Sequence, residues 1–205
     1  MKQFKVVISG PALIMHNGRL ANPRDPYAKA LKEITSKKKK SDDDHEEMAR
    51  REFQGGLYHD DDIGPFIPGE AIQAMLVEGS RKAKQGREFV SVSVEEDRVP
   101  LQYKGPRERD ALWADDKFVI TVGVKVGTSR VMRTRPLFRN WTLEFTVTIE
   151  DGATVNPSDV ERALVTAGRL IGIGDWRPGS PRGGRYGRFA LEKFEEIRKT
   201  TKKAA

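Results

Sequence analysis

Residues 141–149 have the sequence WTLEFTVTI, and residues 118–126 have the sequence FVITVGVKV. Apolar and polar side chains alternate along both stretches, which is the period of a β-strand with one buried face. The segment between them is rich in arginine and contains Pro136, which favours the edge or a bend of a sheet. The two stretches therefore predict strands, with a basic hairpin or finger over residues 104–140 beside the sheet.

Four further strands are expected on either side of this pair. Residues 4–9 (FKVVIS) are rich in apolar and β-branched side chains, and Gly10-Pro11 ends the run. Residues 89–94 alternate apolar and polar, and residues 99–103 are expected to pair with them. Residues 188–194 (RFALEKF) alternate again and predict the last strand.

Two amphipathic helices separate these strands. Ile67-Pro68-Gly69 leads into the first, which we expect to continue through Lys84. Ser158 is expected to cap the second, with Glu161 completing a capping box. Without insertions the order is β, α, β, β, α, β. We therefore expect one α+β domain over residues 1–205, with a ferredoxin-like (RRM-type) βαββαβ core.

Residues 22–56 lie between the first strand and the first core helix, and they predict a helical insertion. Asp25-Pro26 forms an N-cap followed by proline at the first helical position. A second helix is expected to begin at Asp42 or Asp44 and to end before Gly55-Gly56. Both helices are mostly polar, which indicates a surface position. Residues 196–205 form a basic tail that we expect to be frayed.

The composition excludes several classes of protein. The 205 residues include no cysteine, which rules out disulfides, thiolate zinc sites and cysteine nucleophiles, and favours a reducing, cytoplasmic location. No stretch reaches the roughly 18 apolar residues that a membrane span needs, so we expect no membrane partner. The formal net charge of +7 is compatible with a polyanionic partner.

The arginines that suggest such a partner are concentrated in two stretches. Residues 128–140 contain four arginines and no acid, together with Phe138 and Trp141 at their end. Residues 172–189 read GIGDWRPGSPRGGRYGRF, in which glycines allow close approach of a phosphate, arginines match its oxygens and rings stack on bases. The alternatives are a solvated edge for the first stretch and a flexible surface loop, with its tryptophan in the core, for the second. The residues expected to contact nucleic acid are Arg130, Arg133, Arg135, Arg139, Trp176, Arg177, Arg182, Gly183, Gly184, Arg185, Tyr186 and Arg188.

The first strand running into Gly10-Pro11, the Ile67-Pro68-Gly69 helix entry and the late glycine-rich stretch together resemble the RAMP superfamily. These are RRM-like proteins of CRISPR effector complexes, in particular the backbone subunit that polymerises along guide RNA. The resemblance implies a ferredoxin-like core with a helical insertion, single-strand binding and self-association. A stand-alone, phage-encoded relative fits the pattern as well. The residues that match the family's glycine-rich loop are Gly172, Gly174, Gly183, Gly184 and Gly187.

Asp60, Asp61 and Asp62 follow His59 in a polar stretch and are the candidates for a catalytic or divalent-metal site. Some RAMP backbone subunits cut RNA with an aspartate in this region. Consecutive residues of an extended loop point in different directions, however, so a solvated loop is the alternative. The histidines lie in polar stretches without a nucleophile motif, so no hydrolytic triad is expected. We expect no cofactor and no resident metal.

Three functions follow from these patterns. The first is a protein that coats single-stranded DNA or RNA with little sequence preference and is not primarily an enzyme. The second is a guide-RNA-binding subunit of a CRISPR-type ribonucleoprotein, with the aspartate loop as a metal-dependent RNA-cleaving site. The third is a structural or assembly protein whose basic face binds an acidic protein partner.

Overall fold

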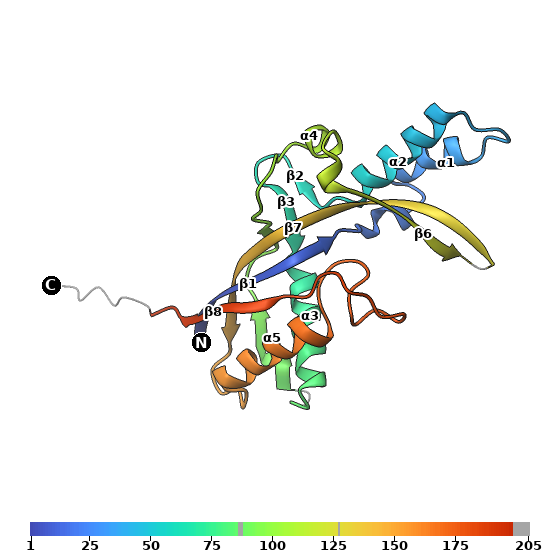
Figure 1. The fold of residues 1–205 in the computed structure, drawn as a ribbon. Helices are drawn as coiled ribbons and strands as arrows, with labels where there is room; N and C mark the ends of the chain where they lie inside the picture. The colour runs from blue at the N-terminus through green and yellow to red at the C-terminus, as the bar shows by residue number, and fades with distance from the viewer. Residues whose placement is uncertain (86–87, 127, 199–205) are drawn as a thin grey trace.

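The chain is an α+β protein built around an antiparallel sheet (Figure 1). The computed structural model describes residues 1–85, 88–126 and 128–198. The strands of the main sheet are β1 (Lys2–Ile14), β4 (Val92–Val94), β7 (Ser129–Ile149) and β8 (Ala190–Glu196), in the order β4-β7-β1-β8. β6 (Val119–Val126) pairs with the first part of β7, and the two form a long hairpin. The expected α+β class is confirmed.

A smaller sheet has the order β2-β3-β5 and consists of β2 (His59–Asp60), β3 (Gly64–Pro68) and β5 (Arg98–Pro100). The expected pairing of residues 99–103 with residues 89–94 is wrong, because β5 pairs with β3 through Ile67 opposite Val99. Val92–Val94 pairs instead with the end of β7. Which strands become neighbours depends on contacts between distant segments, and local alternation does not contain that information.

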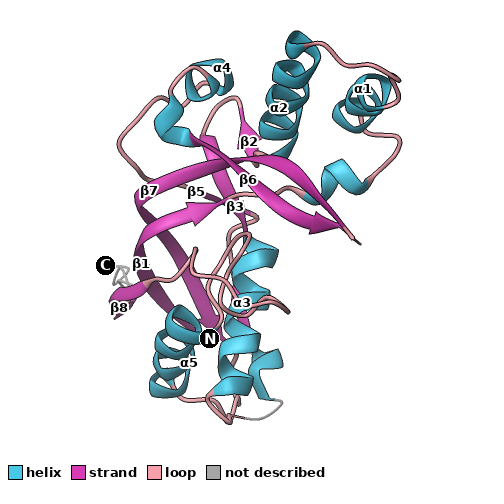
Figure 2. Ribbon diagram, turned by 45° about the vertical axis from the view of Figure 1, so that its right-hand side comes forward, coloured by secondary structure: helices cyan, strands magenta, loops and turns pink. Residues whose placement is uncertain are grey.

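The helices α3 (Gly69–Lys82) and α5 (Pro157–Leu170) lie side by side against one face of the main sheet (Figures 1 and 2). They approach closely at Gly79, where an added Cβ would lie 2.5 Å from the Ala163 carbonyl oxygen. The sheet residues on this face form the core, and all are buried: Phe4, Val6, Ile8, Trp141, Leu143, Phe145, Val147 and Ile149.

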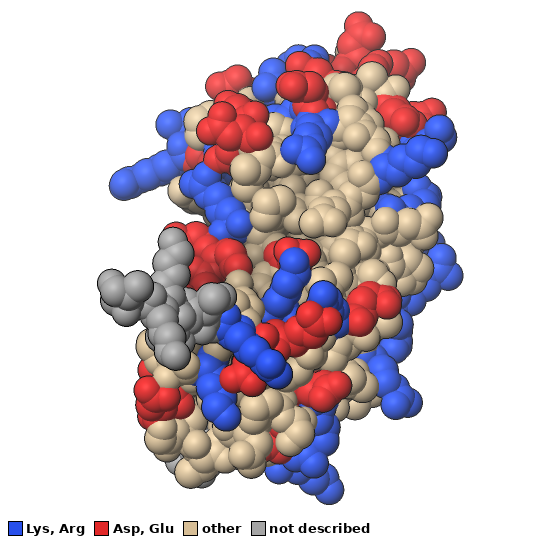
Figure 3. Space-filling model, turned by 90° about the vertical axis from the view of Figure 1, so that its left-hand side faces the viewer, with Lys and Arg blue, Asp and Glu red and all other residues tan. Residues whose placement is uncertain are grey.

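The other face of the main sheet is polar. Lys5 Nζ lies 2.6 Å from Glu144 Oε1, and the Ser9 hydroxyl donates to Glu192 at 2.5 Å. Figure 3 views the molecule from one side and shows acidic and basic side chains interspersed over that surface. A mixed surface of this kind does not attract a polyanion over its whole area.

β1 continues beyond Gly10-Pro11, where the sequence was expected to end it. Gly10 pairs opposite Trp141 and Ala12 opposite Arg139, so the strand reaches Ile14. Glycine is required at the first of these positions because a Cβ would lie 2.6 Å from the Trp141 ring. β7 is likewise a single strand of 21 residues, and Pro136 lies within it, opposite Val119 at the end of the hairpin ladder.

The helical insertion contains the 3₁₀ turn η1 (Gly18–Ala21) and the helices α1 (Pro26–Thr35) and α2 (Asp42–Gly56). The expected cap of α1 is confirmed, because the Asp25 carboxylate accepts the Tyr27 N–H at 2.9 Å. The expectation that both helices lie only on the surface is wrong for α2, whose Phe53 is fully buried. Two 3₁₀ turns and one short helix complete the described elements: η2 (Glu88–Ser91), η3 (Asp116–Phe118) and α4 (Arg109–Trp113).

The cap of α5 is Asn156, not Ser158. Pro157 occupies the first helical position, and the Asp159 carboxylate accepts the Asn156 N–H at 3.1 Å. Both Ser158 and Asn156 are followed three residues later by an acid, so the local pattern allowed two positions for the start. Proline at the first helical position, which has no N–H to leave unsatisfied, favours the earlier one.

Replacing Asp159 with alanine is therefore expected to lower the free energy of unfolding by about 1 kcal/mol, because the Asn156 N–H loses its acceptor and Arg162 loses its ion-pair partner. Glu161→Ala is expected to change it by less than about 0.5 kcal/mol, since Glu161 is exposed and does not take part in the cap. Urea denaturation of both variants measures the difference. A larger loss in Glu161→Ala than in Asp159→Ala would instead show that the helix begins at Ser158.

Candidate nucleic-acid interface

The two arginine-rich stretches meet where β1 ends. The Asp175 N–H donates to the Ile14 carbonyl oxygen at 2.8 Å, and the Asp175 carboxylate lies 3.5 Å from Arg135 Nε. Ile14, Arg135 and Asp175 thus join the first strand, the hairpin and the glycine-rich loop, and we call this contact the junction. In Figures 1 and 2 the hairpin and the loop that follows α5 extend on the same side of the molecule.

Two of the arginines that were expected to contact nucleic acid form ion pairs within the protein. Arg133 donates to the Glu52 carboxylate, which also accepts the Thr134 N–H at 2.8 Å and is only 4% exposed. Arg135 is 8% exposed and contacts Asp175. Arg133 thus connects the hairpin to α2, and Arg135 connects it to the glycine-rich loop. The nearby carboxylates largely neutralise the charges of both arginines.

Glu52→Ala is expected to lower the free energy of unfolding by about 2–3 kcal/mol, because it leaves the buried Thr134 N–H without an acceptor and removes the ion pair of Arg133. Arg133 is partly exposed, so water can solvate its guanidinium in the variant. The loss of free energy of unfolding is therefore smaller than for a fully buried ion pair. Glu47→Ala on the same helix removes a half-buried pair with Arg51 and is the control. Thermal or urea denaturation measures both, and equal small losses would contradict a structural role for Glu52.

Arg139 and Arg188 are exposed and donate to backbone carbonyl oxygens, those of Lys117 and Arg169 respectively. The two aromatic residues at the end of the first stretch, Phe138 and Trp141, are fully buried. Their expected place on the surface of the finger is wrong, because β7 continues into the main sheet and carries both rings into the core. They offer no stacking surface.

The glycine-rich loop is a closed, hydrogen-bonded structure. The Ile173 N–H donates to the Gly187 carbonyl oxygen at 2.9 Å, and the Gly187 N–H donates to that of Ala12 at 2.7 Å. At Gly187 φ is +67°, and an added Cβ would lie 1.7 Å from the Ile173 carbonyl oxygen. This glycine therefore allows two segments of the loop to cross. Gly183, at the tip, has open space around its Cα and remains available for close approach by a ligand.

The other arginines expected to contact nucleic acid are exposed or half-buried. Arg130, Arg182 and Arg185 are exposed, and Arg177 is half-buried with one long hydrogen bond of 3.4 Å to the Gly174 carbonyl oxygen. The Arg185 guanidinium lies 5.5 Å from the Tyr186 ring centre, and that ring lies 6.3 Å from Trp176. Both rings are half-buried, so part of each is open to stacking.

A cavity of about 210 Å³ lies between the start of α3 and the glycine-rich loop. Its walls include Ile67, Met75 and Ile173, and its polar lining includes His16, Glu78 and Arg177. Partial burial, assisted by the charge of Arg135, holds the pKa of His16 below its usual value, so the ring is neutral near pH 7. Sequence reasoning missed Glu78, because a lone acid on an amphipathic helix carries no local signal of a site.

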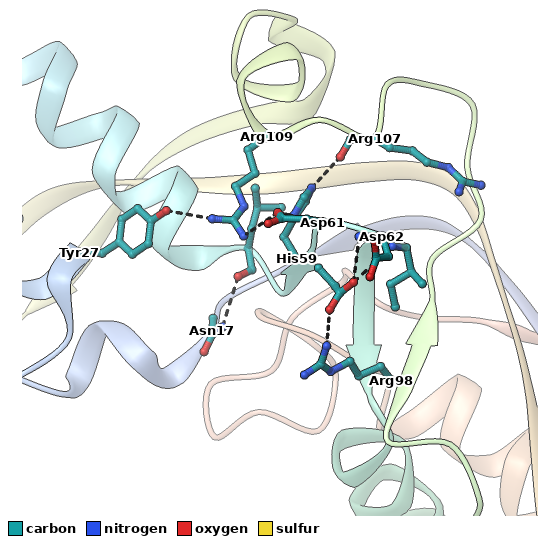
Figure 4. A network of polar contacts seen from close by, with 11 residues as sticks. Asn17, Tyr27, His59, Asp61, Asp62, Arg98, Arg107 and Arg109 are labelled. Atoms are coloured by element: carbon teal, nitrogen blue, oxygen red, sulfur yellow. Dashed lines mark hydrogen bonds and ion pairs between the residues drawn. The ribbon is translucent and has the colours of Figure 1, made fainter.

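The aspartate loop forms a structural turn (Figure 4). The Asp60 carboxylate accepts the Asp62 N–H at 3.0 Å and pairs with Arg98, and these contacts hold the pKa of Asp60 below its ordinary value. Asp61 points toward Arg109, at 3.5 Å, and is 92% exposed. Within the described ranges, no three histidine or acidic side chains are grouped so that they could hold a metal ion.

No helix in the described part of the chain is both long enough and apolar enough to span a membrane. A scan of protein-family models and a search of curated proteins returned no match to this sequence. Any functional conclusion therefore depends on the geometry and charge of the described residues.

Proposed function

We propose that the chain binds single-stranded DNA or RNA, with little sequence preference, along the side of the molecule where the hairpin and the glycine-rich loop both extend. The observation that carries this proposal is the junction, which brings two distant arginine-rich stretches together. The contact set is smaller than the sequence suggested. It consists of Arg130, Arg177, Arg182 and Arg185 for phosphates and of Trp176 and Tyr186 for stacking, and we call it the basic surface.

We also propose that the core is ferredoxin-like and related to the RAMP superfamily. The order β4-β7-β1-β8 supports this, because β1, α3 and β4 form one βαβ half while β7, α5 and β8 form the other. The open face of the sheet has Lys5, Ser9 and Glu144 where RRM domains stack bases on aromatic rings. We therefore assign binding to the basic surface instead of the sheet.

Fluorescence anisotropy with matched single- and double-stranded oligonucleotides of DNA and RNA tests the proposal. The single strand is expected to bind more tightly, since only unpaired bases can stack on the two rings. Its affinity is expected to fall steeply between about 50 and 200 mM salt. Equal affinity for the duplex, or affinity that does not depend on salt, would contradict the proposal. The guide-RNA-binding alternative predicts copurified RNA of one defined length.

A further inference from the structure

The cavity beside the junction contains two opposite charges that do not meet. Glu78 and Arg177 both line it, yet no ion pair joins them, and Glu78 has no hydrogen-bond or ion-pair partner within the described ranges. Arg177 uses only its 3.4 Å bond to Gly174, which leaves most of its five N–H donors unused. This arrangement suits a ligand that donates hydrogen bonds to the carboxylate and accepts hydrogen bonds from the guanidinium.

The walls of the cavity favour a mostly apolar group. Ile67, Met75 and Ile173 are buried, and Ala71 and Ala74 leave room above the first turns of α3. A cavity of about 150 Å³ holds a benzene ring. The volume of about 210 Å³ is therefore enough for most of a planar base, with its sugar and phosphate left at the open side.

We propose that this cavity binds a guanine base. Guanine presents two parallel donors, N1–H and N2–H, which match the two oxygens of the Glu78 carboxylate, and its O6 and N7 acceptors are the preferred partners of an arginine such as Arg177. Uracil and thymine offer a single donor, and adenine and cytosine offer one amino group. His16, which is neutral, forms part of the rim without adding charge.

The inference rests on the proposed function for the origin of the base, which would be one nucleotide of the bound strand turned out of its stack. Arg177 then serves both roles, because it belongs to the basic surface and to the cavity. The consequence is that one position along the strand is read while the others are bound through phosphates and stacking. Binding is then sequence-tolerant overall but favours a strand with one guanine over a strand with none.

Isothermal titration calorimetry with GMP, IMP, AMP, CMP and UMP tests the cavity without any strand. GMP is expected to bind about tenfold or more tightly than UMP, and more tightly than IMP, which lacks the 2-amino group. Glu78→Gln is expected to abolish the difference between GMP and IMP, because the amide no longer accepts two hydrogen bonds. Glu161→Gln, an exposed acid on α5, is the control and is expected to keep it. Ala74→Trp fills the cavity and is expected to abolish GMP binding.

Measuring the affinity for single-stranded oligonucleotides distinguishes failure of this inference from failure of the proposed function. A thymidine homopolymer is compared with the same strand containing one guanosine, and the preference for the guanosine-containing strand is expected to be smaller in Glu78→Gln than in the wild type, with the remainder supplied by Arg177. If the homopolymer binds but the five nucleotides bind equally or not at all, the guanine site is wrong and the proposed function stands. If GMP binds selectively but no strand binds, the proposed function is wrong and the cavity is a mononucleotide site.

Discussion

Replacing Arg130 and Arg185 together with glutamine is expected to weaken single-strand binding by about ten- to a hundredfold at low salt. Arg130 lies on the hairpin and Arg185 on the glycine-rich loop, and both are exposed. Each neutralised phosphate on a single strand contributes about 0.7 to the slope of log affinity against log salt. Loss of two contacts therefore lowers that slope by about 1.4. Anisotropy titrations at several salt concentrations measure both quantities.

The matched control removes the same charge elsewhere. Arg81 on α3 and Arg162 on α5 are both exposed, belong to neither the hairpin nor the loop, and include one ion pair, between Arg162 and Asp159 at 2.9 Å. The variant with glutamine at both positions has the same net charge as the Arg130 and Arg185 double variant. It is expected to keep the wild-type slope of log affinity against log salt, and to lose only a little affinity because the overall positive potential is weaker. Equal effects in the two double variants would mean that binding follows net charge alone, and the basic surface would then have no special role.

Gly187→Ala is expected to lower the free energy of unfolding by about 4 kcal/mol or more, which is exceptional for the addition of one methyl group. A left-handed conformation costs a residue with a Cβ about 1–2 kcal/mol. The new Cβ would also lie 1.7 Å from the Ile173 carbonyl oxygen, so the loop must move. That movement breaks the hydrogen bonds that connect Gly187 with Ile173 and Ala12.

Gly183→Ala distinguishes the cost of the left-handed backbone conformation from the cost of the steric clash. Gly183 has φ of +63°, close to that of Gly187, but nothing lies within 4 Å of an added Cβ. The expected loss is about 1–2 kcal/mol, from the backbone conformation alone. Urea denaturation, with the midpoint and the slope fitted separately, measures both variants. Similar losses would show that the crossing at Gly187 is not tightly packed.

Signals confined to a few neighbouring residues predicted much of the fold. Alternation in residues 118–126 and 141–149 found β6 and the core half of β7. Asp25 followed by Pro26 located the start of α1. These predictions succeeded because strand period, capping and the geometry of proline act within a few residues along the chain.

Features that depend on contacts between distant segments were predicted wrongly or not at all. The buried Phe138 and Trp141 looked like surface rings, because their environment depends on β7 continuing between β1 and β4. The glycines of the loop looked like a place for phosphates, but at Gly187 the space is taken by another part of the same loop. Of the predicted tail, residues 199–205 lie outside the described residues.

The amino-acid sequence by itself determined where the arginines lie along the chain and that they occupy two stretches poor in acids. Only the tertiary structure decided which of them remain available to a ligand. Glu52 and Asp175, from distant parts of the chain, neutralise Arg133 and Arg135, while Arg130 and Arg185 stay exposed. The reason is physical: an ion pair requires two groups within a few ångströms, and the fold fixes that separation.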